Sequence, residues 1–148
     1  MSVETWVQIG FSVIAVIAFI LLRQGMKPFI PVGLFASLYA NVWCYLAMRF
    51  GWWDFPARLV PFVREISVPA NMLIVPVMAM IWVRYSPMKR LYWALLWTCG
   101  LTGGEFLIER YTAVLKYHSG YDWYFSFLLW FASWFIWYYF HRWFWRKD

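Results

Sequence analysis

Five apolar stretches joined by short connections make up most of this 148-residue chain. Each is close to the ~20 residues that a helix needs to cross about 30 Å of hydrocarbon. Only 14% of the residues are charged, against about 25% in an ordinary globular domain. The sequence therefore predicts an all-α integral membrane bundle of about five transmembrane helices, in one polytopic domain over residues 1–148. The spans are expected near residues 5–22, 32–48, 66–83, 91–108 and 124–140.

The distribution of Lys and Arg over the connections predicts an orientation. The side with the first and third connections and the C-terminus carries eight bases, and the opposite side carries five. Because basic loops stay in the cytoplasm, we expect a multi-pass protein of the bacterial plasma membrane with its N-terminus outside and its C-terminus cytoplasmic. The net charge is +6, and the Lys and Arg residues are spread singly among the apolar spans. That spacing favours anionic membrane lipids, rather than nucleic acid, as the partner.

Aromatic residues form a quarter of the chain, and two interpretations of them stay open. Trp and Tyr are enriched where a membrane meets water, so the rings are expected either in such belts or along the wall of a pocket. The connection 51–65 mixes aromatic rings with Arg58 and Arg64 and is broken by Pro56 and Pro61. This mixture predicts a short interfacial segment between the second and third helices.

The third span contains Pro69 and Pro76, with Asn71 between them. Proline in a helix interior removes a hydrogen bond, so Pro76 is expected to kink the helix and free the carbonyl of Met72. Freed carbonyls are found at binding sites, but proline is also common in membrane helices in general. Asn71 is therefore a candidate ligand-binding residue.

Glu105 stands in the second half of the fourth span. A carboxylate within hydrocarbon costs roughly 2.5–3.5 kcal/mol to insert, so it marks a functional site or a buried polar contact. Glu109 lies one helical turn further on the same face. Gly100 and Gly104 have the spacing of a close helix contact. The alternative to a functional site is thus a packing interface in which Glu105 is hydrogen bonded. Its candidate partners there are Tyr39, Asn41, Asn71 and Arg84.

The loop after the fourth span is dense in groups that are capable of chemistry. A histidine beside acids titrates near neutral pH and can relay protons, so we assign Glu105, Glu109 and His118 as candidate catalytic residues. The candidate ligand-binding residues are Asn71, Arg110, Tyr111, Tyr117, Asp122 and Trp123. No cluster of ligands has a metal-binding spacing, and no motif predicts a cofactor.

The stretch from Ser67 to Phe127 resembles a family of small multi-pass membrane proteins of spore-forming Gram-positive bacteria. The resemblance lies in Glu105 late in the fourth span, Tyr117-His118, and Trp123 before Ser126-Phe127, together with Pro76 and the basic hairpin Tyr85-Ser86-Pro87-Met88-Lys89-Arg90. It covers under half of the chain. It implies a polytopic plasma-membrane protein and implies no activity.

Three functions are consistent with these features. The first is a membrane protein with a polar site around Glu105, on the outer-leaflet side, that binds or passes a small ligand, lipid or proton. The second is a membrane-embedded enzyme on an isoprenoid or lipid substrate, with Glu105 as general acid and aromatic rings that stabilise a carbocation. The third is a partner subunit or assembly factor. A homo-oligomer and a membrane partner both stay open. A closed aromatic cavity with Glu105 and Asn71 in its wall would favour a ligand site or an enzyme.

Overall fold

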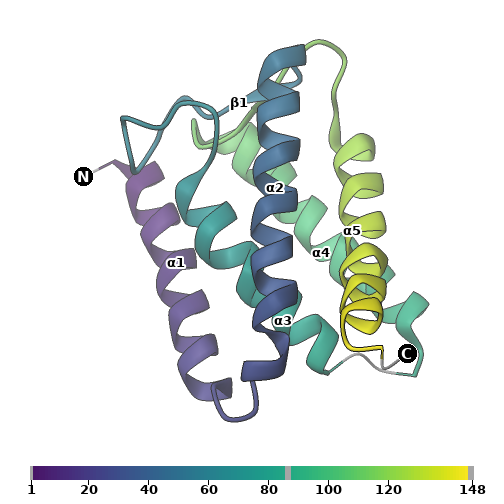
Figure 1. Cartoon of the computed structure of the whole chain (residues 1–148). Helices are drawn as coiled ribbons and strands as arrows, with labels where there is room; N and C mark the ends of the chain where they lie inside the picture. Colours follow the sequence, from purple (N-terminus) through teal and green to yellow (C-terminus); the bar gives the residue numbers. More distant parts are fainter. Residues whose placement is uncertain (1, 86–87, 147–148) are drawn as a thin grey trace.

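The described part of the chain folds into five α-helices with very little sheet, as the computed structural model shows (Figure 1). The structure describes residues 2–85 and 88–146. The helices are α1 (Val3–Leu22), α2 (Ile30–Phe50), α3 (Val75–Arg84), α4 (Arg90–Tyr111) and α5 (Trp123–Phe144). The 3₁₀ turn η1 (Lys27–Phe29) precedes α2, and the π-helix η2 (Ala70–Ile74) precedes α3. The predicted all-α class is confirmed, and a helix corresponds to each of the five predicted segments.

The main core lies between α2, α3 and α5, and α1 packs against α3 and η2. Trp134 and Trp137 of α5 are among its largest fully buried side chains. The indole of Trp134 donates to Thr98 Oγ1 in α4 at 3.0 Å, so a polar contact holds these two helices together. Helices α2 and α3 approach closely at Gly33, where an added Cβ would lie 3.0 Å from Met80 Cγ.

The two long loops at the N-terminal end of the molecule are joined by a small antiparallel sheet. Strand β1 (Trp53–Asp54) pairs with β2 (Lys116–Tyr117), with Trp53 opposite Tyr117. Trp53 and Phe55 are buried in a second apolar cluster, whereas Phe62 is 93% exposed. The connection 51–65 therefore packs much of its aromatic surface against the protein. Trp53 and Phe55 are thus not available to a membrane surface, and an interfacial segment in the residues beyond Phe55 stays a prediction.

The prolines of the third segment are accommodated by a wide helical turn. Pro69 is the N-cap of η2, and the N–H of Val75 donates to the carbonyl of Ala70, five residues earlier. Pro76 occupies the first turn of α3. A kink was expected at Pro76, and the structure has a π-helix directly before it. π-Helices are frequent at functional sites. Asn71 is buried within this turn.

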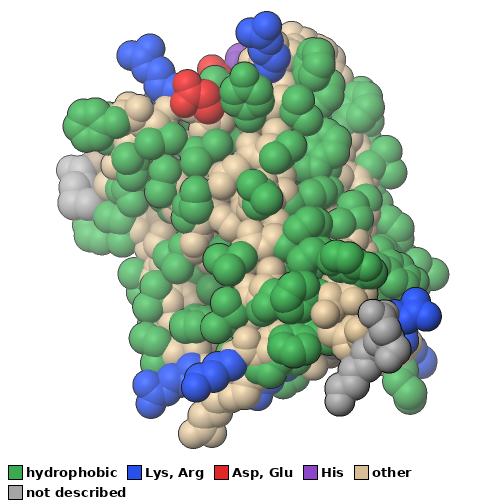
Figure 2. Space-filling model, in the orientation of Figure 1, with side chains coloured by type: hydrophobic (Ala, Val, Ile, Leu, Met, Phe, Trp, Pro, Cys, Tyr) green, Lys and Arg blue, Asp and Glu red, His purple; other side chains and the backbone are tan. Residues whose placement is uncertain are grey.

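Apolar side chains cover most of the visible face of the molecule between its two ends (Figure 2). Lys and Arg side chains lie at both ends, and the visible Asp and Glu side chains lie at one end. Among the described residues, the helical segments Val3–Leu22 and Lys27–Phe50 are long and apolar enough to cross a membrane. Both lie near the N-terminus, and most of their residues are not buried within the protein.

Candidate functional site: an aromatic cavity around Glu105

The carboxylate of Glu105 is held by three hydrogen-bond donors. Trp130 Nε1 in α5 donates to Oε1 at 2.7 Å. The hydroxyl of Tyr117 in β2 bonds to Oε2 at 3.2 Å, and the hydroxyl of Ser126 in α5 bonds to the same oxygen. Hydrogen bonds to a charged acceptor are stronger than those between neutral groups. This cluster therefore fixes the side chain of Glu105 between α4, α5 and the loop.

One face of α5 supplies most of the polar wall around this carboxylate. Ser126, Trp130, Ser133 and Trp137 follow one another at intervals of four, three and four residues, which places them on one side of a helix. All four line one cavity. The hydroxyls of Ser133 and Tyr39 are hydrogen bonded at 3.2 Å, which links this face of α5 to α2.

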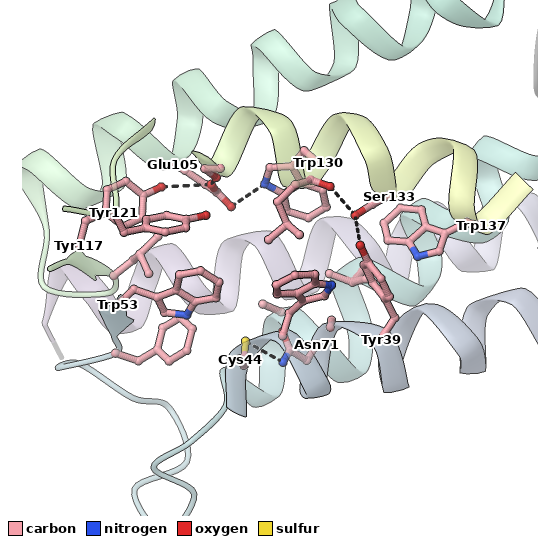
Figure 3. Close-up of a pocket in the computed structure, with 18 residues that line it drawn as sticks. Tyr39, Cys44, Trp53, Asn71, Glu105, Tyr117, Tyr121, Trp130, Ser133 and Trp137 are labelled. Carbon is pink, nitrogen blue, oxygen red and sulfur yellow. Dashed lines mark hydrogen bonds between the residues drawn. The ribbon is translucent and has the colours of Figure 1, made fainter. Parts of the chain in front are cut away.

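The cavity has a volume of about 140 Å³. In Figure 3, Glu105 and Trp130 lie on one side of it, and Cys44 and Asn71 lie on the other. Asn71 Nδ2 donates to Asn41 Oδ1 at 2.9 Å and to Cys44 Sγ at 3.2 Å. The aromatic residues of the wall are Tyr39, Trp43, Trp53, Phe55, Tyr117, Tyr121, Trp130 and Trp137. Among the described residues, no Lys, Arg or His lines this space.

The two loop tyrosines beside Glu105 keep their protons. Burial raises the pKa of Tyr117 and of Tyr121 well above the ordinary value, and the negative charge of Glu105 raises both further. Both phenols are therefore neutral at physiological pH. Tyr117 consequently acts as a hydrogen-bond donor to the carboxylate rather than as a second anion.

An open groove of about 530 Å³ adjoins the cavity between α2 and α5. Its α5 side is formed by Phe125, Leu128, Ala132 and Ile136, which repeat at helical spacing. The groove and the cavity share five wall residues, which are Tyr39, Trp43, Trp53, Tyr121 and Leu129. The groove and the cavity are therefore neighbours that share a wall of mainly aromatic side chains.

Of the predicted site residues, the structure brings Glu105, Asn71 and Tyr117 to one cavity. A closed aromatic cavity with these two residues in its wall was expected for a ligand site or an enzyme, and the cavity has Glu105, Asn71 and the aromatic wall but is partly open. The suggested partners of Glu105 were wrong, because its hydrogen bonds are to Tyr117, Ser126 and Trp130. Arg84 instead donates to the carbonyl of Leu22 at 2.6 Å.

The other predicted site residues lie outside this cavity. His118 Nε2 is 3.2 Å from Asp54 Oδ1, in a pair whose side chains are both about half exposed. The carbonyl of Glu109 accepts a hydrogen bond from Lys116 Nζ. Asp122 caps α5 through the N–H of Trp123 at 2.7 Å. Trp123 itself is half exposed, and Arg110 and Tyr111 are exposed at the end of α4.

The expected helix contact at Gly100 and Gly104 does not occur among the residues that the structure describes. No atom lies within 4 Å of a Cβ built at Gly100, Gly103 or Gly104, apart from the immediate neighbours on the helix itself. The contact face of α4 is instead the one that carries Thr98 and Glu105, which bond to α5.

Sequence reasoning missed the wall residues that α5 provides. A signal for them was present, because the pattern Ser-x₃-Trp-x₂-Ser-x₃-Trp from Ser126 to Trp137 places small hydroxyl groups and indoles on one helical face. Trp53 and Tyr121 carry no comparable signal. They reach the cavity only because the two loops pair.

Comparison with protein-family models, with curated proteins and with solved structures gives no match for this chain. The resemblance to membrane proteins of spore-forming bacteria therefore stays a prediction from the sequence. The function must be argued from the geometry of the cavity.

Proposed function

We propose that this chain is a polytopic protein of the bacterial plasma membrane that binds a lipid-soluble ligand in the cavity around Glu105. The observation that carries the proposal is a carboxylate fixed by three donors in the wall of an aromatic cavity, next to an apolar groove on the outside of the bundle. Ligand sites in proteins are typically concave and mostly apolar, with a few well-placed polar groups.

The surface of α1 supports the membrane part of this proposal. A core helix of a soluble protein buries its apolar residues, but α1 leaves most of its large apolar side chains exposed, up to 76% exposure at Leu21. Exposed apolar patches above a few hundred Å² are rare on soluble monomers. Hydrocarbon chains would cover this surface at no such cost.

Helices α4 and α5 add two crossings to those of α1 and α2, and the helix formed by η2 and α3 is proposed as the fifth. Each has 22 residues, and at 1.5 Å per residue this length exceeds a hydrocarbon core of about 30 Å. Both are rich in Trp and Tyr, which hydropathy scales rate as less apolar than Leu although their rings suit the membrane boundary. The helix formed by η2 and α3 is shorter and packs against α1 and α2.

The placement of charges supports an N-terminus outside and a C-terminus in the cytoplasm. The N-terminus and the two loops joined by β1 and β2 lie at one end of the bundle, and the α1–α2 connection and the C-terminus lie at the other (Figure 1). The second end carries the larger number of bases, as cytoplasmic ends do. Glu105 then lies in the half of α4 nearer the outer leaflet.

No observation specifically favours an enzyme. A general acid must carry and present a proton to a substrate, whereas the three groups bonded to Glu105 all donate to its oxygens. His118, the proposed proton relay, lies outside the cavity. An enzyme and a partner subunit stay predictions, and a ligand-binding site is the function that the geometry supports best.

Native mass spectrometry of the detergent-extracted protein tests this proposal. We expect the wild-type protein to carry a co-purified ligand, which fragmentation would identify. Ala40→Phe places a ring in the cavity, whose volume is close to that of the engineered ~150 Å³ cavity that accepts one benzene. The adduct should therefore be largely lost in this variant.

Leu38→Phe is the matched control, because Leu38 lies on the same helix, is exposed, and lines neither the cavity nor the groove. It should retain the adduct. Thermal unfolding of both variants verifies that they are folded. A wild-type protein without any adduct, or equal adducts in the two variants, would contradict a ligand site in this cavity.

A further inference from the structure

We infer that the ligand of this cavity carries an organic ammonium head, held by the Glu105 carboxylate and by the faces of the surrounding aromatic rings. The inference rests on the proposed ligand site and names the chemical class that this site selects. Charge, ring content and size each support it, and the adjoining groove indicates that an alkyl chain extends from the head.

Charge is the first argument. The three groups bonded to Glu105 are an indole and two hydroxyls, which orient the carboxylate but carry no positive charge. Among the described residues, no Lys, Arg or His lines the cavity. Glu105 is half-buried, and an ion withdrawn from water without a counter-charge is costly. A cationic ligand would supply that charge, whereas an anionic one would add a second uncompensated charge.

The carboxylate also has room for one more partner. Its two oxygens offer about four acceptor positions. Among the described residues, Tyr117 and Ser126 donate to Oε2 and only Trp130 donates to Oε1. An ammonium group beside Oε1 would take the remaining position without displacing a donor.

The rings of the wall are the second argument. Four Trp, three Tyr and one Phe line a cavity of about 140 Å³. Aromatic faces attract cations through the ring quadrupole, and cages of this kind recognise quaternary ammonium groups. Tyr117 and Tyr121 remain neutral because burial raises their pKa. Their rings therefore add attraction for a cation and no further charge.

Size and surroundings indicate that the ligand is an amphiphile. A cavity that accepts a group as large as benzene suits a trimethylammonium head. The groove beyond Trp43 and Tyr121 is lined by apolar side chains of α5 and runs along the outside of the bundle. An alkyl chain attached to the head would lie there, with hydrocarbon as its other neighbour.

Isothermal titration calorimetry in uncharged maltoside micelles tests the inference. The probe is octyltrimethylammonium, with protein-free micelles as the blank. Choline and its neutral carbon isostere 3,3-dimethylbutan-1-ol are then used as competitors. We expect the probe to bind, choline to displace it, and the neutral isostere to displace it at least about tenfold less well, because it loses both the ion pair and the cation–π attraction.

Two pairs of variants separate charge from shape. Glu105→Gln should raise the Kd of the probe about tenfold or more, whereas Glu109→Gln, one turn further along α4 and outside the cavity, should leave it unchanged. Tyr121→Phe keeps the ring and should bind nearly as well as wild type. Tyr121→Leu loses the ring face and should bind several-fold more weakly.

The possible outcomes are distinct. Tighter binding of the octyl probe than of choline indicates a tailed ligand as the natural occupant, and equal affinities indicate a free ammonium compound. Equal displacement by the neutral isostere, or an unchanged Kd in Glu105→Gln, overturns the ammonium inference. The ammonium inference is also overturned if the probe does not bind while native mass spectrometry shows a different adduct on the protein. In that case the proposal of a ligand site is still supported.

Discussion

Trp130 is the residue on which the position of Glu105 most depends. Its indole supplies the only hydrogen bond to Oε1 among the described residues, and its ring also lines the cavity. Hydrogen bonds between membrane helices contribute about 0.6 kcal/mol on average and up to roughly 1.7 kcal/mol. A contact to a carboxylate should lie in the upper part of that range.

Trp130→Phe keeps an aromatic ring and deletes the donor. We expect a loss of about 1 kcal/mol of stability, seen as a fall in the unfolding temperature of a few degrees by scanning fluorimetry in detergent. Trp143→Phe on the same helix is the control. Because Trp143 is 70% exposed, the unfolding temperature of this variant should change little. If both variants shift equally, the bond to Glu105 does not stabilise the fold.

At this scale the sequence identified the central residue but not its partners. Glu105 stood out because a charge in an apolar span is costly. Its partners depend on which face of α5 meets α4, and this is a property of tertiary packing. In a helix bundle of unknown packing, each suggested partner on α2 or α3 could have lain beside Glu105. Only the periodicity of Ser126, Trp130 and Ser133 distinguished α5 from them.

Gly33 sets the distance between α2 and α3. An added Cβ there would lie 3.0–3.3 Å from the side chain of Met80. Alanine would press only on a flexible methionine, whereas a β-branched residue has two further methyl groups to place. Overpacking of this kind typically costs about 1–3 kcal/mol.

Gly33→Val is therefore expected to lower the unfolding temperature clearly. Gly10→Val is the control. It makes the same substitution within helix α1, at a position where nothing lies within 4 Å of the new Cβ. Both variants alter intrinsic helix propensity equally, so their difference measures the packing between α2 and α3. Indistinguishable unfolding temperatures would mean that α3 can move away from α2 at no cost.

Helices were predictable in this chain and loops were not. Long apolar segments define helices by length alone, so the predicted segment 91–108 corresponds to α4 (Arg90–Tyr111). The two prolines predicted an irregular third helix, but they did not predict that one of its turns would widen to a π-helix. The pairing of Trp53 with Tyr117 joins residues 64 positions apart, and no local pattern carries that information. This pairing nevertheless brings two rings to the cavity.

The whole molecule has two ends of different composition and an apolar surface between them (Figure 2). Five crossings require that the two termini lie on opposite sides of the membrane, and four or six would place them on the same side. The five-helix arrangement is therefore testable by the accessibility of single cysteines. Cys99 is exposed and Cys44 is buried, so a Cys99→Ser background should show little labelling of its own.

In that background, Val3→Cys and Tyr111→Cys should react with a membrane-impermeant maleimide on intact bacterial cells. Both positions are exposed. Val3 begins α1, and Tyr111 ends α4 just before the loop that carries β2, at the end assigned to the outside. Gln24→Cys and Arg146→Cys lie at the opposite end, which carries more bases, and should react only after the membrane is permeabilised. Labelling of Val3→Cys and Arg146→Cys on the same side would rule out an odd number of crossings. The reverse pattern at all four positions would keep five crossings but invert the orientation, and Glu105 would then face a ligand from the cytoplasmic leaflet.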